Sequence, residues 1–317
     1  MTGAIVLTTN QGLGYLAKDF YNNGVIDKVL IRQHSSRENH PEWYGDNGKP
    51  LDVRNYDWFF EGLDSILMFE EVWDWKIVLE ARNRRVKSFL MVMYECTRNP
   101  LPYSPDAILC PSLLDLDYYK DRNGISVTVP VNEPWTLRKK AKVFVHNAGN
   151  GGLGGRNGTK ELIEAMKYVK SPIKLIIRTQ EHDFKCDDPR VEIRYGTVSR
   201  ETLYSEGDVF IFPEKFNGLS LPIQEAYASG MPIMCGDRHP MNIWLPTDIM
   251  IPVKGYKKER ISVEFDSAII DPIDIAETID RWYGKDISKY SLMGKEWGKN
   301  NNWKKLKKQY AKLLSSF

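Results

Sequence analysis

Residues 213–233 read PEKFNGLSLPIQEAYASGMPI, and the fold and the function of the chain are interpreted outward from this stretch. The apolar residues 209–212 before it predict a buried β-strand, and residues 221–228 predict a helix. Backbone N–H groups at a helix start are unpaired and carry the positive end of the helix dipole, and Gly218 lets the backbone approach a phosphate closely. Glu225, one turn into the helix, can accept two hydrogen bonds from a vicinal diol such as a ribose. The stretch therefore predicts an anion site beside a diol acceptor.

A plainer interpretation exists for each residue alone, because Ser220 and Pro222 are common at helix starts and Gly230 is a common helix C-cap. Taken together, the stretch resembles the nucleotide-sugar signature of the large retaining group of GT-B glycosyltransferases. In that family an acidic residue, a glycine-containing loop, a Glu eight positions later, an Ala and a Gly-x-Pro turn recur. The resemblance implies that the loop residues Gly218, Leu219 and Ser220 bind the donor diphosphate and that Glu225 binds the ribose.

One position departs from the family pattern. Asn217 stands where the family usually has the first Glu, and Glu214 is close but out of register. In the family that acid contacts the transferred sugar or its phosphate, and an amide can hydrogen-bond a hydroxyl but carries no charge. We therefore expect Asn217 to contact the sugar.

A second segment, residues 143–165, begins the C-terminal half as strand, glycine loop and amphipathic helix. It resembles the first C-terminal βα unit of the family, in which a basic residue pairs with the donor diphosphate. Arg156 stands at that place between Gly155 and Asn157, and a fork of donors suits a leaving diphosphate that gains negative charge. A dinucleotide-binding glycine loop is the alternative, but the acidic residue expected about 20 positions later is not clear.

The family often has another Arg directly after this strand, where the chain has residues 146–148, HNA. Arg178, after the next strand, is a candidate for the missing partner, and an exposed arginine at a strand end is an equal alternative. In the first half, Gly12 and Gly14 follow the opening strand, and the resemblance implies that their loop faces the diphosphate across an interdomain cleft. A plain β-to-α turn explains these glycines nearly as well.

Three acids follow predicted strands of the first half at the sheet edge where α/β proteins place their sites: Glu70, Glu71 and Glu95. We prefer Glu95 as the group that binds or deprotonates an acceptor hydroxyl, and an exposed loop acid is the alternative. Asp115 and Asp117 match an Asp-x-Asp metal motif only superficially, and we interpret them as acids at a helix start. No metal site and no cofactor beyond the donor are predicted, and the four cysteines lie too far apart for a zinc site or a disulfide framework.

Composition and periodicity set the architecture. The 317 residues suit two domains, and short apolar runs alternate with helical patterns, so the fold class is α/β with parallel strands. We predict a GT-B fold of two Rossmann-like, doubly wound domains: residues 1–135 for the acceptor, 136–290 for the donor and a C-terminal amphipathic helix, 291–317, that packs back on the first domain. Strands are expected at residues 4–8, 28–31, 65–69, 88–93, 107–110, 126–129, 142–146, 174–178, 192–195, 209–212, 232–235 and 249–252. The clearest helices are expected at residues 14–22, 73–84, 158–169, 199–206 and 221–228.

By the mechanism that the resemblance implies, a sugar is transferred from a nucleotide-diphosphate sugar, with UDP favoured, to an acceptor hydroxyl with retention of configuration. The acceptor expected is a carbohydrate or a lipid-linked molecule, in a cytoplasmic protein without a metal. Two alternatives stay open: a transferase that acts on a hydroxylated base in DNA, and a GT-B module that binds a nucleotide or glycan without catalysis. The lysine-rich segment 295–317 also allows peripheral contact with anionic lipid or nucleic acid.

Overall fold

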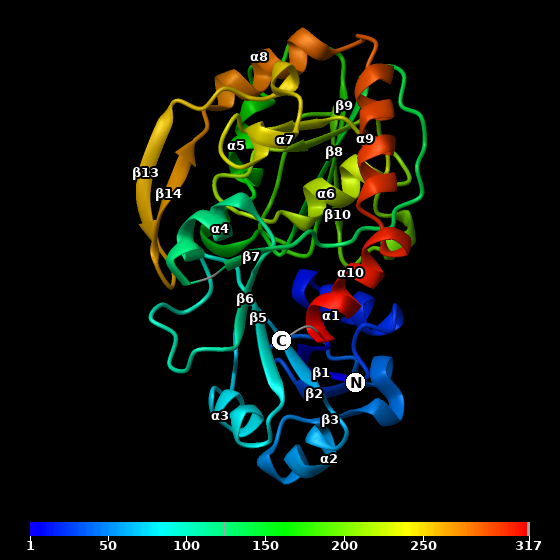
Figure 1. Cartoon of the computed structure of the whole chain (residues 1–317). Coiled ribbons are helices and arrows are strands. Elements are labelled where there is room, and N and C mark those ends of the chain that lie inside the picture. Colours follow the sequence, from blue (N-terminus) through cyan, green and yellow to red (C-terminus); the bar gives the residue numbers. More distant parts are fainter. Residues whose placement is uncertain (123, 316–317) are drawn as a thin grey trace. The chain divides into compact units, whose positions relative to one another are not determined.

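The computed structural model describes residues 1–122 and 124–315 and divides into two compact units. Unit 1 comprises Met1–Pro130, Arg260–Val263 and the C-terminal segment from Trp303, and unit 2 comprises Val131–Glu259 and Glu264–Asn302. Each unit has its own parallel sheet with helices around it (Figure 1). No helix in the described part of the chain combines the length and the apolar composition that crossing a bilayer demands.

Unit 1 is built on a seven-stranded sheet in the order β3-β2-β1-β4-β5-β6-β7, in which every neighbouring pair is parallel. The order reverses direction between β1 and β4, which is the topological switch point of a doubly wound sheet. The strands are β1 (Thr2–Leu7), β2 (Lys28–Arg32), β3 (Gly48–Pro50), β4 (Ser65–Phe69), β5 (Lys87–Met91), β6 (Ala107–Cys110) and β7 (Gly124–Ser126). The helices are α1 (Gly12–Asn22), α2 (Tyr56–Phe60), α3 (Lys76–Asn83), α4 (Leu113–Tyr119) and, from the end of the chain, α10 (Trp303–Ser315).

Helix α10 is amphipathic, and its apolar side is part of the core of unit 1. Its buried side chains recur at helical spacing: Trp303, Leu306, Tyr310 and Leu314. The rings of Trp303 and Tyr310 each lie 4.9 Å from the ring of Phe20 on α1. The lysines of α10 are exposed. Because the apolar side is already covered by unit 1, only the lysine side of this helix faces solvent.

Unit 2 is built on a five-stranded parallel sheet in the order β10-β9-β8-β11-β12, with its switch point between β8 and β11. The strands are β8 (Val143–Gly149), β9 (Lys174–Thr179), β10 (Val191–Tyr195), β11 (Val209–Phe212) and β12 (Ile233–Cys235), and a separate hairpin is formed by β13 (Gly255–Arg260) and β14 (Glu264–Ile269). The helices are α5 (Thr159–Ala165), α6 (Leu221–Ala228), α7 (Met241–Trp244), α8 (Pro272–Trp282) and α9 (Ser288–Asn300).

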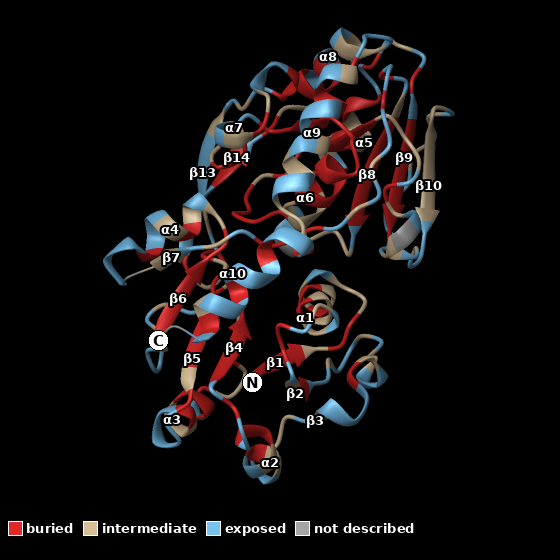
Figure 2. Ribbon diagram, turned by 45° about the vertical axis from the view of Figure 1, so that its right-hand side comes forward, coloured by how far each residue is buried: buried red, intermediate tan, exposed pale blue. Residues whose placement is uncertain are grey.

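Alternation along β11 shows how this sheet is covered on both faces. Val209 and Ile211 pack in one apolar cluster with residues of α5 and α8, whereas Phe210 and Phe212 pack in another with residues of α6. Successive side chains of a strand point to opposite faces, so α5 and α8 cover one face and α6 covers the other. The central strands of both sheets, such as β4 and β11, are accordingly fully buried, whereas the edge strands β3, β7 and β10 are only partly buried (Figure 2).

The predicted fold class is confirmed, and several predicted elements need correction. The expected C-terminal helix, residues 291–317, is two helices, because α9 ends at Asn300 and α10 begins at Trp303. Residues 316–317 of this prediction lie outside the described residues. The expected helix 199–206 is only a 3₁₀ turn at Arg200–Thr202. The expected strand 249–252 is one isolated bridge, between Gly236 and Ile251, and Pro252 lacks the N–H that a longer strand would need. The expected strand 126–129 is β7, and the hairpin β13–β14 was not predicted.

Candidate functional site

Two loops of unit 2 meet at the switch point of its sheet. One loop joins β8 to α5 and contains Arg156, and the other joins β11 to α6 and contains Asn217. The backbone N–H of Lys215 donates to the carbonyl of Arg156 at 2.8 Å, and the Lys215 ammonium lies 2.7 Å from the carboxylate of Glu161 on α5. The structure therefore brings together the two segments that the sequence analysis singled out separately.

Gly158 allows these loops to approach so closely. It is the N-cap of α5 with a left-handed φ of +71°, and a Cβ at this position would lie 2.1 Å from the carbonyl oxygen of Pro213. Only glycine accepts both the conformation and the contact. The expected binding residue Gly155 is also left-handed, but a Cβ there would meet nothing within 4 Å. Asn157 closes the loop by donating from Nδ2 to the carbonyl of Ala148 at 2.8 Å.

Both ends of the Asn217 amide are engaged by the protein. Nδ2 donates to Glu214 Oε1 at 2.9 Å, and Oδ1 accepts the backbone N–H of Ser220 at 3.2 Å. The Glu214 carboxylate also faces the guanidinium of Arg238 at 3.0 Å, and Arg238 donates to the carbonyl of Asn217. All three side chains are buried, and buried charges need such pairing. Asn217 thus shapes the loop, with Glu214 as its partner.

Sequence reasoning missed Arg238 and set Glu214 aside as out of register. Arg238 follows β12, and its Nε also donates to the carbonyl of Glu214 at 2.9 Å. A carboxylate that directly follows a buried strand needs a cation, but nothing local in the sequence says which arginine supplies it. The pairing depends on the neighbouring positions of β11 and β12 in the sheet.

Ser220 is the N-cap of α6 and has a φ of +44°, which is uncommon for a residue with a side chain. Its hydroxyl Oγ is buried and has no hydrogen-bond partner among the described residues. Strained backbone of this kind persists where the surroundings hold it, often at functional sites. Gly218 and Leu219 are buried in the same loop. The start of α6 therefore presents the Ser220 hydroxyl at the positive end of the helix dipole, while the N–H groups of Ile223 and Gln224 are bonded to the carbonyl of Ser220.

Glu225 lies on α6 with its carboxylate held by two side chains from the crossover between β10 and β11. Arg200 Nη2 lies 2.7 Å from Oε1, and the hydroxyl of Tyr204 donates to Oε2 at 2.8 Å. Burial and the Glu225 charge raise the pKa of Tyr204 well above its usual value, so this hydroxyl stays protonated and donates. Neither Arg200 nor Tyr204 was expected from the sequence.

The guanidinium of Arg178, expected to pair with the donor diphosphate, is held by groups of the protein. Its guanidinium is buried, forms an ion pair with Glu206 and donates to Asn147 Oδ1 at 3.2 Å and to the carbonyl of Leu203 at 2.9 Å. These contacts tie β9 to β8 and to the crossover that follows β10. Arg178 therefore stabilises the arrangement of these strands.

In unit 1 the two glycines after β1 differ. A Cβ on Gly14 would lie 2.2 Å from the carbonyl oxygen of Thr9, so α1 packs against the turn only with glycine there, whereas a Cβ on Gly12 would meet nothing within 4 Å. The plain turn therefore explains Gly14. The same sheet edge carries a cluster that sequence reasoning missed, in which His40 stacks on Trp43 and hydrogen-bonds Asn10 and Glu42.

The three candidate acids of unit 1 lie in the loops after β4 and β5. Glu70 has a φ of +58°, and its carbonyl accepts from the hydroxyl of Thr97, while Glu71 accepts from the indole of Trp75 at 3.3 Å. Glu95 is only 1% exposed. Asp115 lies in the first turn of α4 and donates its backbone N–H to the N-cap hydroxyl of Ser112 at 3.1 Å. Its carboxylate accepts the backbone N–H of Tyr94 at 2.8 Å, and burial raises its pKa to about 6.

The helix-start interpretation of Asp115 therefore agrees with its contacts. Within residues 1–122 and 124–315, no three His, Cys, Asp or Glu side chains gather into a group that could hold a metal ion.

No protein-family model matches the sequence, and no curated protein matches it. Solved structures do match the fold. Anabaena HepE in complex with UDP and glucose has a TM-score of 0.68 at 11% identity, with 100% of both chains covered. Sucrose-phosphate synthase from Thermosynechococcus elongatus has a TM-score of 0.65 at 14% identity, covering 98% of this chain and 97% of the other. A glycosyltransferase from Rickettsia africae has a TM-score of 0.68 at 11% identity, covering 100% and 99%. The chain therefore has the GT-B fold of these transferases along its whole length.

Proposed function

We propose that the chain is a glycosyltransferase that transfers a sugar from a UDP-sugar to an acceptor hydroxyl. The observation that carries the proposal is the meeting, in unit 2, of the Arg156 loop and the α6 N-terminus at the sheet's switch point, with Glu225 one turn along the helix. Ligands of open α/β sheets bind at this position. Structures of the same fold support the choice of nucleotide, since HepE was solved with UDP and with UDP-glucose.

In this proposal the diphosphate lies against the backbone N–H groups of Gly218 and Leu219, beside the Ser220 hydroxyl. Arg156 supplies the positive charge that stabilises the leaving diphosphate. Glu225, held by Tyr204, accepts hydrogen bonds from the hydroxyls of the ribose. The network of Glu214, Asn217 and Arg238 keeps the loop rigid, so that its donors need no reorganisation when the bond breaks. The transfer proceeds with retention and without a metal.

The first experiment measures thermal unfolding of the purified chain with UDP, GDP, ADP and their sugars. Ligand that binds the folded state raises the melting temperature in proportion to the logarithm of its concentration over Kd. We expect UDP to raise it, and Glu225→Gln to weaken UDP binding by about tenfold, because an amide replaces an ionised acceptor. Thr202→Ala, in the same crossover, serves as the matched control. No stabilisation by any of these nucleotides would sink the proposal.

The second experiment follows release of UDP from UDP-sugars and assigns the anomeric configuration of the product by NMR. Release in the presence of an acceptor, with the configuration of the donor, is the expected result. A chain that binds UDP tightly yet releases none with any sugar or acceptor is instead a binding module. Inverted product would contradict the retaining mechanism and leave the transferase function standing.

A further inference from the structure

The guanidinium of Arg200 lies between two carboxylates of unit 2. Its Nη2 is 2.7 Å from Glu225, and its Nε is 3.9 Å from Glu133 in the segment that enters this unit. The side chains of Glu225 and Glu133 are 11% and 7% exposed. Two such carboxylates on one cation compete for it, since each buried charge needs a partner. Arg200 therefore has a bonded position on Glu225 and a second carboxylate within reach.

The two hydroxyls of a ribose diol cannot both donate to Glu225 while the carboxylate oxygens accept from Arg200 and Tyr204. The diol needs lone pairs directed toward it, and little of the Glu225 side chain is exposed. One of the groups that engage these oxygens must then yield. Tyr204 is almost completely buried and cannot withdraw without opening the core, whereas Arg200 stands on a short 3₁₀ turn and its side chain is 23% exposed. Arg200 is therefore the partner that the ribose displaces.

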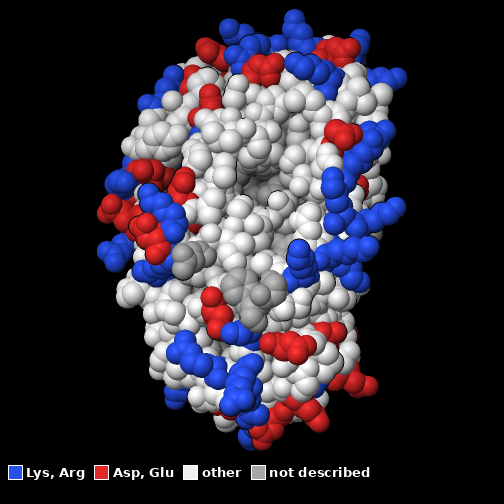
Figure 3. Space-filling model, in the orientation of Figure 1, with Lys and Arg blue, Asp and Glu red and all other residues white. Residues whose placement is uncertain are grey.

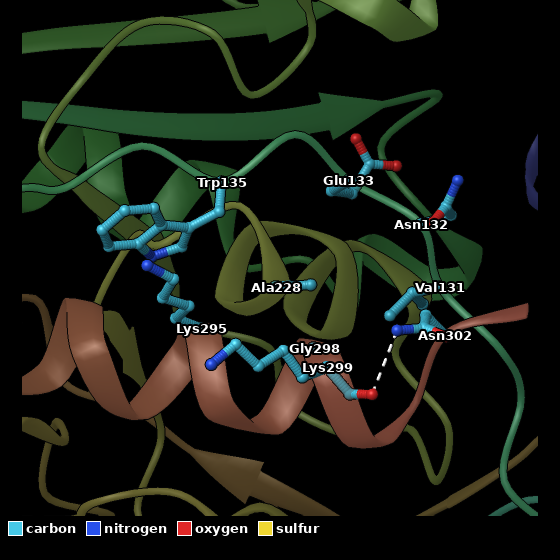
Figure 4. A pocket seen from close by; sticks show the side chains of 9 residues that line it. All are labelled: Val131, Asn132, Glu133, Trp135, Ala228, Lys295, Gly298, Lys299 and Asn302. Atoms are coloured by element: carbon cyan, nitrogen blue, oxygen red, sulfur yellow. Dashed lines mark hydrogen bonds between the residues drawn. The ribbon is translucent and has the colours of Figure 1, made fainter. Parts of the chain in front are cut away.

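A pocket beside Glu133 leaves room for the displaced guanidinium. Glu133 lines a pocket of about 200 Å³ in unit 2, together with Trp135, Ala228 of α6 and Lys295 of α9. In Figure 4 the Glu133 side chain lies apart from the Lys295 side chain, which is under the Trp135 ring at 3.9 Å from its centroid. Ala228 is three residues after Glu225, so the pocket and the carboxylate lie along the same side of α6.

We propose that Arg200 sets the affinity of the ribose site by exchanging carboxylates: it pairs with Glu225 in the empty site and with Glu133 when a nucleotide's 2′,3′-diol takes Glu225. The inference rests on the proposed function. In the empty site Arg200 lies 2.7 Å from the Glu225 carboxylate and offsets its charge. On binding, two neutral hydroxyls replace it on Glu225, and its charge stays paired on Glu133. The exchange lowers the affinity for ribonucleotides and so favours release of the nucleotide product.

The test is a comparison of Kd values for UDP and for 2′,3′-dideoxy-UDP, measured by calorimetry on the full chain. Arg200→Gln removes the competitor, so UDP should bind about tenfold more tightly while the dideoxy nucleotide is unchanged. Glu133→Gln removes the second carboxylate, so UDP should bind about tenfold more weakly, again without effect on the dideoxy nucleotide. Arg194→Gln, another paired arginine of unit 2, is the matched control and should change neither Kd.

Each other outcome decides against the exchange. If Arg200→Gln weakens UDP alone, Arg200 orients Glu225 for the diol and is not displaced. If it weakens UDP and the dideoxy nucleotide equally, Arg200 contacts the phosphates. Thermal unfolding of each variant verifies that it is folded, and the opposite signs expected for Arg200→Gln and Glu133→Gln cannot both come from general destabilisation. If neither nucleotide binds the unmodified chain, the proposed function fails first.

Discussion

The imidazole of His146 is enclosed in the core of unit 2 and joins three of its elements. Nδ1 lies 2.9 Å from the carbonyl of Ile211 on β11, and Nε2 lies 2.8 Å from the hydroxyl of Thr159 on α5. The carbonyl can only accept, so Nδ1 carries the proton and Nε2 accepts from Thr159. Burial lowers the pKa of His146 to about 4. The ring is neutral in the folded chain and fixes β8 beside the start of α5.

This lowered pKa predicts a loss of stability in mild acid. Between pH 6.5 and pH 4 the unfolded chain binds a proton at His146 that the folded chain does not, so the free energy of unfolding falls as pH falls. The neutral ring contributes about 3 kcal/mol to the free energy of unfolding above pH 6.5, and this contribution is lost as the pH approaches 4. Urea titrations at pH 7.5, 6 and 4.5 measure it. His146→Gln, which has no titrating group, should show a flatter profile over this window.

Asp115 in unit 1 works in the opposite direction, because its pKa is raised and the folded state binds its proton more tightly below about pH 6. Only the difference between the parent chain and His146→Gln therefore isolates the histidine. Parallel profiles for the two proteins would contradict the assignment.

At the scale of single residues, sequence reasoning selected Arg156, Asn217 and Glu225 as candidates from local spacing between a strand and a helix, β8 and α5 for Arg156 and β11 and α6 for the other two. It could not supply the partners that hold them. Arg200 lies in the crossover between β10 and β11, and Arg238 follows β12, the strand next to β11. Their contacts can therefore be predicted only when the strand order is known. Asn217 was expected to contact the sugar, whereas the structure shows both ends of its amide engaged within the loop.

At the scale of elements, the need for glycine at Gly158, where α5 begins, can be tested by comparison with Gly155, which has a similar left-handed φ. Gly158→Ala would place a methyl group against the Pro213 carbonyl as well as in the left-handed region, and should cost about 3 kcal/mol of unfolding free energy. Gly155→Ala has the strained φ but open space around it, and should cost about 1 kcal/mol. Urea unfolding compares the two. Equal costs would mean that the close approach of the two loops is not what requires glycine.

Element boundaries show why the C-terminal segment was predicted as one helix. Its apolar and basic residues keep a helical period on both sides of residues 301–302. Periodicity alone therefore predicts one continuous helix across these two residues. The chain breaks there because asparagine side chains compete with the helix for backbone groups. Asn301 Nδ2 donates to the carbonyl of Trp297 at 2.9 Å, and Asn302 Nδ2 donates to that of Lys299 at 3.0 Å. These bonds satisfy the last carbonyls of α9 and end it.

At the scale of the whole molecule, exposed basic side chains gather on the C-terminal helices. The face drawn in Figure 3 carries Lys and Arg side chains along the margin where α9 lies in Figure 1. The lysines of α10 are also exposed, while its apolar residues are buried in unit 1. Any attraction of this helix to anionic lipid or nucleic acid is therefore electrostatic and should weaken steeply with salt.

The two units differ in how they depend on the chain's end, and this difference predicts which of them folds alone. Every residue of the two apolar clusters of unit 2 lies between 131 and 302, as do all the proposed donor contacts. A fragment of residues 131–302 should therefore unfold cooperatively in urea and be stabilised by UDP, with Glu225→Gln in the fragment as the control. Residues 1–130 lack α10, so Phe20 loses the rings of Trp303 and Tyr310.

Losing two large buried aromatic contacts costs several kcal/mol, which is comparable with the whole stability of a domain. The fragment of residues 1–130 should therefore show no cooperative transition, and a peptide of residues 303–315 should restore one. If the 131–302 fragment folds but UDP no longer stabilises it, although the full chain responds, then residues of unit 1 contribute to the nucleotide site. If residues 1–130 fold without the peptide, α10 is an accessory element and not part of the core of unit 1.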